Sequence, residues 1–280
     1  MCYDETMKNN YIYSTADISH FYDLTAKGLA YYEEQGIIHP LRKQDSSYRI
    51  FTLNDCYSLY HSKMYKNGGL SLKEMANLEK DGTLEEIIRT LSNSSQNELD
   101  RIKIETRIQE RIQEITNILD DFNKNGNFYK IVDRKECYRL YVRNFDLEHE
   151  SDKKSSEEFA LWNSYIPIDT ASLLYPKEKV LSDDEEMNVN IANIITKEDF
   201  EFLNLEKTSH VNFYPTCKCM KTIIYGDAED IDSKKWLKEP LKYLEENHYE
   251  LEGDILTSML LVTGERGAKT RYDLAWFPIK

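Results

Sequence analysis

Cysteine and histidine side chains are the groups in this sequence best suited to metal or redox chemistry, and their spacing favours neither. Cys217 and Cys219 would lie on one face of a strand, because strand residues two apart point the same way. This Cys-x-Cys pair leaves metal or thiol sensing open as an alternative. The six histidines are dispersed and show no zinc-helix spacing. The sequence contains no Gly-rich phosphate loop, nucleophile elbow or paired Cys/His motif, so we predict no metal, no cofactor and no catalytic residue.

The C-terminal half is rich in aromatic side chains that could bind a small molecule. Aromatic faces attract cations, and a buried carboxylate would supply the counter-charge. We therefore predict a pocket for an amphipathic molecule, with cationic aromatic compounds as a class that would fit. The candidate lining residues are Trp162, Tyr175, Tyr214, Tyr225, Asp273 and Trp276. Two alternatives stay open: individual aromatic residues belong to the core, or a carboxylate such as Asp273 or Glu252 is the base of a hydrolase.

Basic and aromatic residues in the N-terminal third are suited to binding DNA. A helix that exposes Thr25, Lys27 and Tyr31 could enter a major groove, where base edges are readable. Phosphate contacts would come from residues on or beside a hairpin, and from the helix after it: Arg42, Lys43, Tyr48, Arg49 and Lys66. Residues 11–80 carry eight Lys and Arg against eight Asp and Glu, so this region is neutral. A neutral unit can still bind DNA if its cations gather on one face.

The overall composition indicates a globular, cytoplasmic protein. The 280 residues are enough for two domains, with 40% hydrophobic and 31% charged residues. The net charge of -14 is concentrated in the second half, where residues 126–280 carry 21 basic against 30 acidic side chains. Five scattered cysteines fit a reducing compartment. No apolar run is long enough to span a bilayer, and residues 1–10 lack the apolar core of a signal peptide.

The elements that must carry the DNA-contacting residues are short helices with clear start signals. Capping boxes, in which a Ser or Thr precedes an acidic residue by three positions, occur at Ser14–Asp17, Ser71–Glu74, Thr83–Glu86 and Ser95–Glu98. A helix over residues 25–34 would stop at Gly36, since glycine tolerates the left-handed backbone that ends helices. Residues 37–52 are predicted to form a short hairpin or wing, because residues 48–51 show the alternation typical of a strand. Another helix follows from Leu53 to near Gly68.

A long helix is expected between the two halves of the chain. After the box at Ser95–Glu98, apolar residues recur in alternating steps of four and three: Ile108, Ile112, Ile115, Leu119 and Phe122. That spacing is typical of a coiled-coil seam, and a second copy of the chain is the simplest way to bury it. The alternative is a helix packed on the core of its own domain. Residues 123–127, Asn-Lys-Asn-Gly-Asn, would end the helix and mark a domain boundary.

Beyond this boundary the pattern predicts an α+β domain built from two βαββ units, with a groove between its two lobes. Strands are expected at residues 131–143, 168–175 and 189–196, with a helix at 155–165. A weaker repeat of that order follows, with strands at 219–225, 255–263 and 271–279 and a helix at 233–247. The predicted domains are therefore residues 11–80, a linker and dimerisation helix at 83–123, and residues 128–280.

The N-terminal pattern resembles the MerR family of transcription regulators. The resemblance rests on residues 27–38 (KGLAYYEEQGII), Pro40, Arg42 and residues 48–51 (YRIF). It implies a winged helix-turn-helix that binds promoter DNA as a homodimer, with two long helices paired antiparallel and RNA polymerase engaged indirectly. The chain departs from the family at Ala30, where an arginine usually precedes the Tyr-Tyr-Glu run. That difference removes an expected DNA contact.

The C-terminal half resembles the GyrI-like effector-binding domain. The matching parts are residues 213–215 (FYP), the strand that ends at Tyr225-Gly226, residues 235–253 and the terminal Pro278-Ile279. This resemblance implies a module that binds a small-molecule effector, and the chain would then be a ligand-responsive regulator. Some GyrI-like domains are hydrolases, so the alternative is a hydrolase or sequestering protein with a degenerate DNA-binding domain. The glutamate that the family carries on a late strand is absent; Asp273 is the nearest carboxylate.

Overall fold

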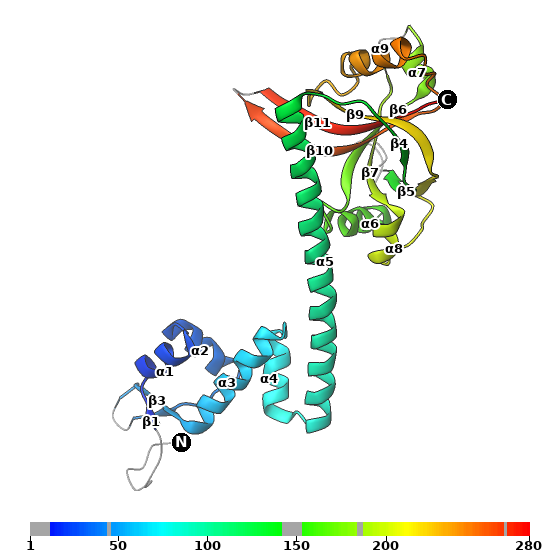
Figure 1. Cartoon of the computed structure of the whole chain (residues 1–280). Helices are drawn as coiled ribbons and strands as arrows, with labels where there is room; N and C mark the ends of the chain where they lie inside the picture. Colours follow the sequence, from blue (N-terminus) through cyan, green and yellow to red (C-terminus); the bar gives the residue numbers. More distant parts are fainter. Residues whose placement is uncertain (1–11, 44–45, 142–152, 184–186, 266–267) are drawn as a thin grey trace. The chain divides into compact units, whose positions relative to one another are not determined.

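The computed structural model describes residues 12–43, 46–141, 153–183, 187–265 and 268–280. The chain divides into two compact units, Met1–Lys103 and Ile104–Lys280. The architecture is mixed: an N-terminal helix-turn-helix, a long helix and a large antiparallel sheet (Figure 1). No helix in the described ranges is long and apolar enough to cross a membrane.

The N-terminal unit is mainly helical and carries a small three-stranded sheet of order β1-β3-β2. Its elements are β1 (Ile12–Tyr13), α1 (Thr15–Tyr22), α2 (Ala26–Glu34), β2 (Leu41–Arg42), β3 (Arg49–Thr52), α3 (Leu53–Asn67) and α4 (Leu72–Asp81). Ile18, Leu29 and Phe51 are fully buried and join α1, α2 and β3 in one core. Strands β2 and β3 pair as a hairpin within the predicted wing, residues 37–52; residues 44–45 lie outside the described residues.

Local start and stop signals position these helices as the sequence predicts. The capping boxes at Ser14, Ser71 and Thr83 all form, and α2 ends before Gly36, whose φ is 73°. The box predicted at Ser95–Glu98 is wrong, because both residues lie inside α5 (Leu84–Asn125). A capping box can form only where backbone N–H groups are still free, and here the helix has already begun at Leu84.

The C-terminal unit is built on an eight-stranded antiparallel sheet of order β4-β9-β11-β10-β6-β7-β5-β8. The strands are β4 (Lys130–Arg134), β5 (Cys137–Tyr141), β6 (Thr170–Tyr175), β7 (Asn190–Thr196), β8 (Val211–Tyr214), β9 (Cys217–Asp227), β10 (Ile255–Glu265) and β11 (Ala268–Pro278). The helices are α6 (Lys153–Asn163), α7 (Lys177–Leu181), α8 (Lys197–Phe202), the 3-10 turn η1 (Lys234–Leu237) and α9 (Lys238–Glu246). The strand predicted at residues 131–143 is two strands, and its last two residues lie outside the described ranges.

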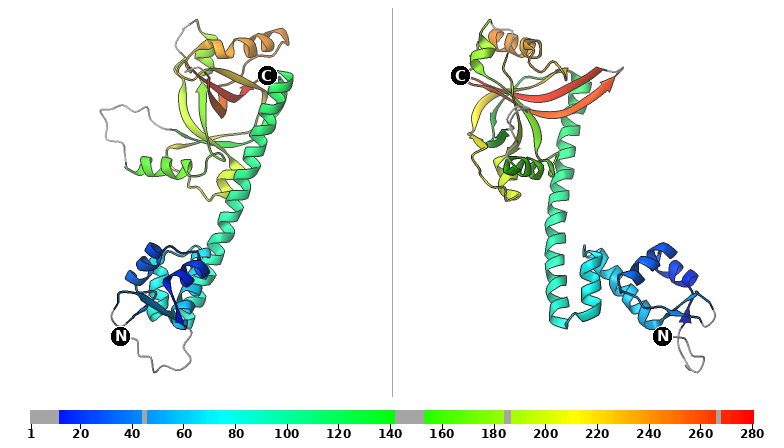
Figure 2. Two further views of the ribbon diagram at one scale, coloured as in Figure 1. Left: turned by 90° about the vertical axis from the view of Figure 1, so that its left-hand side faces the viewer. Right: turned by 180° about the vertical axis from the view of Figure 1, so that it is seen from behind.

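The sheet repeats one strand order on each side of its centre, which supports the predicted βαββ repeat. The first unit runs β5-α6-β6-β7 and the second runs β9-α9-β10-β11. In each unit the third strand lies between the first two, and β6 pairs with β10 where the units meet. Figure 2 shows the curved sheet with α9 near one end and α6 near the other.

The second half of α5 packs on this sheet, which accounts for much of the apolar stripe that the sequence suggested as a dimer seam. Ile115, Leu119 and Phe122 pack against Ile223, Leu260 and Leu274, and Ile108 joins a neighbouring core beside α8. Ile112 is 52% exposed. An apolar stripe shows that a helix face is buried but not which surface buries it, and here the same domain does so.

Candidate DNA-binding surface and ligand pocket

Helix α2 presents a polar and aromatic face next to the wing. Thr25 caps the helix, since its Oγ1 accepts a hydrogen bond from the Gly28 N–H at 3.0 Å. Lys27 is exposed and Tyr31 is 51% exposed; four residues apart, they share one face of α2. Tyr32 is buried in the core. Tyr32 therefore fixes the helix to the core, and Tyr31 stays accessible for binding.

A single carboxylate holds the wing against α2. Arg42 and Arg49 face each other across β2 and β3, and both bind Glu33: Arg49 Nε lies 2.7 Å from Glu33 Oε2, and Arg42 Nη2 contacts Oε1. Burial raises the pKa of Glu33, but hydrogen bonds from Arg49 and Arg42 outweigh it and leave the pKa below its usual value. A guanidinium has five N–H donors, so one carboxylate does not exhaust either arginine.

The remaining predicted DNA contacts lie on two exposed sites. Tyr48, 77% exposed, and Lys43 are at the wing, where the Lys43 N–H donates to the Tyr48 carbonyl at 3.1 Å. Lys66 is exposed on α3, and with Lys63 it lines a shallow hollow beside Asp23 in the α1–α2 turn. The predicted contact residues of α2 and the wing thus lie next to each other, whereas Lys66 lies apart from them in the last turn of α3.

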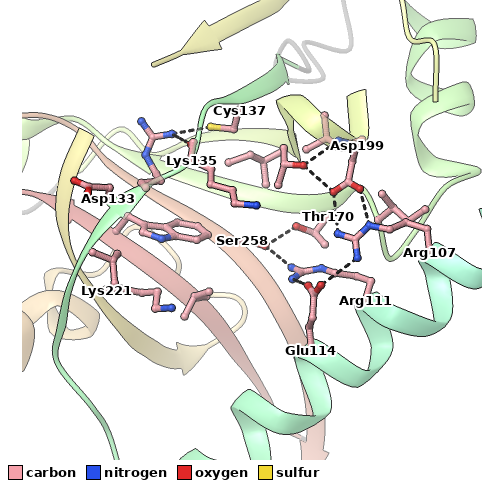
Figure 3. Close-up of a pocket in the computed structure, with 18 residues that line it drawn as sticks. Arg107, Arg111, Glu114, Asp133, Lys135, Cys137, Thr170, Asp199, Lys221 and Ser258 are labelled. Carbon is pink, nitrogen blue, oxygen red and sulfur yellow. Dashed lines mark hydrogen bonds and ion pairs between the residues drawn. The ribbon is translucent and has the colours of Figure 1, made fainter. Parts of the chain in front are cut away.

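The C-terminal unit contains a cavity of about 400 Å³ between the second half of α5 and the sheet (Figure 3). That volume is within the range of small-molecule sites. One wall is apolar and comes from strands β4, β7 and β11 and from the turn just before β6: Val132, Ile194, Leu274, Trp276 and Ile168. Thr170 and Ser258 hydrogen-bond at 2.8 Å where the two halves of the sheet meet.

The wall formed by α5 is a network of ion pairs. Arg107 binds Asp199 through Nε at 2.6 Å and Nη2 at 3.0 Å, and its Nη1 donates to Glu114 at 3.0 Å. Arg111 also binds Glu114 at 3.0 Å and reaches Ser258 at 3.3 Å. The hydrogen bond with Asp199 raises the pKa of Arg107 above its usual value. These two arginines and two carboxylates neutralise one another.

Three cysteines surround Arg134 at one side of the cavity. Arg134 donates to Cys137 Sγ at 2.8 Å and to Cys217 Sγ at 3.3 Å, and the Cys217 and Cys219 sulfurs are 3.3 Å apart. Burial raises the pKa of Cys219 to about 12 and also raises that of Cys137. Over the described part of the chain, no group of three or more His, Cys, Asp or Glu could hold a metal ion.

Comparison with known proteins identifies the N-terminal domain. Residues 13–81 match the MerR HTH family of regulatory proteins. They form a MerR-family helix-turn-helix domain. A relative in Bacillus subtilis (strain 168), the uncharacterized HTH-type transcriptional regulator YyaN, is 27% identical over 109 residues, which span 39% of this chain and 74% of YyaN.

Two solved structures are similar over longer stretches. A cryo-EM structure of an EcmrR–DNA complex in EcmrR-RPo aligns with 96% of this chain and 99% of its own, at 16% identity and a TM-score of 0.35. A crystal structure of a MerR-family transcriptional regulator from Bacillus cereus aligns with 55% of this chain and 99% of its own, at 18% identity and a TM-score of 0.36.

Of the six side chains predicted to bind a ligand, only Trp276 lines the cavity beside α5. Trp162 and Tyr175 are core residues, 1% and 0% exposed. Tyr225 is half exposed and stacks on Tyr272, with ring centroids 5.4 Å apart. Tyr214 lines a separate, open hollow with Arg139.

Asp273, the predicted counter-charge, is fully buried away from this lining. It accepts hydrogen bonds from Arg271 at 2.7 and 2.8 Å and from the Thr257 hydroxyl at 2.5 Å. The sequence prediction missed the charged residues of the cavity, among them Arg107, Arg111 and Lys221. One signal was present in the sequence. Lys221 is two residues from both Cys219 and Ile223, so its side chain shares their face of β9, which is buried.

Proposed function

We propose that this protein is a cytoplasmic, ligand-responsive transcription regulator that binds promoter DNA as a homodimer. The observation that carries the proposal is the MerR-family domain with an exposed Lys27 and Tyr31 on α2, next to a wing bearing two arginines. Side chains on such a helix can reach base edges, and cations on the wing can contact phosphates. RNA polymerase would be engaged indirectly, through the shape of the bound promoter.

Dimerisation is supported by the first half of α5. Its N-terminal part carries four large apolar side chains that are more than half exposed: Leu84 (74%), Ile88 (57%), Leu99 (51%) and Ile102 (58%). These positions fall on one side of the helix, since steps of four, eleven and three residues return to nearly the same direction. A narrow exposed apolar stripe on a long helix fits a second copy of the same helix.

Ligand binding is supported by the cavity of the C-terminal unit, which combines an apolar wall with a polar network. A ligand there would contact α5, the helix whose first half carries the apolar stripe, as well as the sheet. It could act on DNA binding only through different affinities for two conformations. The repeated strand order of the sheet supports a GyrI-like C-terminal unit as part of this proposal.

The test is a DNA-binding titration of the full chain against the DNA upstream of its own coding sequence, at two salt concentrations. Lys27→Ala should weaken binding to the upstream DNA about tenfold and reduce the preference for it over random DNA, because Lys27 lies on the helix proposed to reach base edges. Lys73→Ala, which removes an exposed lysine on α4 away from the predicted surface, is the matched control and should change neither. Equal affinity for upstream and random DNA would refute the proposal.

A further inference from the structure

The cavity of the C-terminal unit is cationic in a protein that is strongly acidic overall. Its lining includes five basic side chains against three carboxylates, while the whole chain has a net charge of -14. In Figure 3, Arg107 and Arg111 come from α5, and Lys135 and Lys221 lie on the opposite side. The surplus of two positive charges is therefore a local feature.

The surplus does not come from the α5 wall. Arg107 and Arg111 are balanced by Asp199 and Glu114 in the network described above. Asp199 is only 6% exposed, and its Oδ2 also accepts a hydrogen bond from the Thr196 hydroxyl at 2.8 Å. Neither of these two carboxylates is available to a ligand cation without breaking an existing pair, and the third lining carboxylate, Asp133, is exposed to solvent.

The uncompensated charges are on the sheet side, where Lys135 is exposed and pairs with Glu198 at 3.3 Å, and Asp133 is exposed to solvent. That leaves Lys221 and Arg134. The Lys221 side chain is half-buried, and its ammonium makes no hydrogen bond or ion pair with any described residue. Burial and the neighbouring Lys130 ammonium both lower its pKa below the usual lysine value. Arg134 is 7% exposed, and the groups its guanidinium contacts are carbonyl oxygens and cysteine sulfurs. A buried charge without a counter-ion is costly, so an anion here would be favoured.

An apolar surface lies directly beside the lysine. Trp276 is the cross-strand neighbour of Lys221 on β11, and Leu274 is on the same strand face as Trp276. Both line the cavity together with Val132, Ile168 and Ile194. A ligand that satisfied Lys221 would thus place its remaining atoms against an indole and aliphatic side chains.

We propose that this cavity binds an amphipathic organic anion, with its carboxylate at Lys221 and its aromatic or aliphatic body against Trp276. The inference rests on the proposed ligand-responsive function and specifies the ligand class. It replaces the cationic ligand expected from the sequence, which needed Asp273 or another buried acid as its counter-charge, whereas Glu114 and Asp199 in the lining are already paired with arginines. Asp273 is instead fully buried and bonded to Arg271 and Thr257.

The test compares three probes that share one body and differ in the head group: 6-phenylhexanoate, 6-phenylhexylamine and 6-phenylhexanol. Binding to the full-length chain is measured by calorimetry and by quenching of tryptophan fluorescence. We expect the carboxylate to bind at least tenfold more tightly than the amine or the alcohol. Tighter binding of the amine, or no saturable binding of the carboxylate at millimolar concentration, would overturn the inference.

Two variants link the preference to the lysine. Lys221→Met should abolish the preference for the carboxylate, whereas Lys221→Arg should retain it, which also shows that the fold tolerates change at this position. Lys218→Met removes an exposed lysine of the same strand outside the cavity and is the matched control. An undiminished preference in a folded Lys221→Met protein would overturn the assignment to Lys221.

The outcome is separable from that of the DNA titration. Specific DNA binding without carboxylate preference would reject only the ligand class. Carboxylate binding by a chain that does not distinguish its upstream DNA would support the pocket and reject the regulator.

Discussion

Asp169 is a buried carboxyl group whose ionisation should oppose folding. The residue is fully buried; its Oδ2 accepts a hydrogen bond from the Asn193 amide, while in the described structure its Oδ1 has no partner. Burial outweighs the hydrogen bonds from Asn193 and Thr170 and raises its pKa from 3.8 to about 7. The folded protein therefore holds this proton more tightly than the unfolded chain does.

The sign of the pH dependence follows from that difference. A group with a raised pKa in the folded state contributes stability at low pH, and this is lost as the pH rises from about 4 through about 7. Each pKa unit corresponds to about 1.4 kcal/mol, so ionised Asp169 costs about 4 kcal/mol at pH 8. Asp169→Asn keeps the acceptor for Asn193 and removes the charge. Its stability advantage should fall from about 4 kcal/mol at pH 8 to about 2 kcal/mol at pH 5.

Urea denaturation followed by tryptophan fluorescence provides the assay. The three tryptophans, Trp162, Trp236 and Trp276, all lie in the C-terminal unit, so the signal reports that unit alone. Asp133→Asn, which removes an exposed carboxylate, is the control and should differ little from wild type at every pH. An advantage of Asp169→Asn that stays constant from pH 5 to pH 8 would refute the reasoning from burial.

Three further substitutions test packing, pairing and assembly. Leu99→Glu puts a charge on the exposed stripe of α5 and should convert a dimer to a monomer in sedimentation. Gly226→Ala should destabilise the C-terminal unit by about 1–3 kcal/mol in urea, because a Cβ there would lie 2.0 Å from Trp236 Nε1. Arg107→Ala leaves the carboxylate of Asp199, which is 6% exposed, without its ion pair, and should cost about 3 kcal/mol in the same assay.

Each of these changes has a matched control elsewhere in the chain. Asn97→Glu adds the same charge to α5 away from the stripe, and should leave the dimer intact. Gly264→Ala adds a methyl group where no described atom lies within 4 Å, and should have little effect on packing. Arg101→Ala breaks an exposed pair with Glu98, which is worth less than about 1 kcal/mol. A control that matches its test variant would contradict the stated cause.

Local signals were predictable from the sequence wherever a short segment determines its own structure. The boxes at Ser14, Ser71 and Thr83 start helices, and the strands predicted at 168–175 and 189–196 coincide closely with β6 and β7. The box at Ser95 failed because the same residue pattern has no capping role inside a helix that has already begun. A capping box therefore predicts a helix start only where the preceding residues are not already helical.

The pocket was less predictable, because its residues come together only through the register of the sheet. Trp162 and Tyr175 were chosen by residue type, and the structure places both in helix-covered cores. Arg107 and Asp199 are 92 residues apart, and nothing local pairs them. The apolar face of α5 was visible as a repeat, yet its spacing could not distinguish the sheet of its own domain from a second helix.

The repeated strand order of the sheet has a consequence for how a ligand would be oriented. Two βαββ copies, as a duplication of one unit would produce, make a scaffold with approximate twofold symmetry. The residues on that scaffold are not symmetric: the second copy contributes Lys221 and Trp276, while the first contributes Asp199 just after its last strand, paired to Arg107. The cavity thus has two unlike ends, so a molecule with two unlike ends would bind in one preferred orientation. Sequence divergence after a duplication would in this way give a symmetric backbone a binding site whose two ends differ.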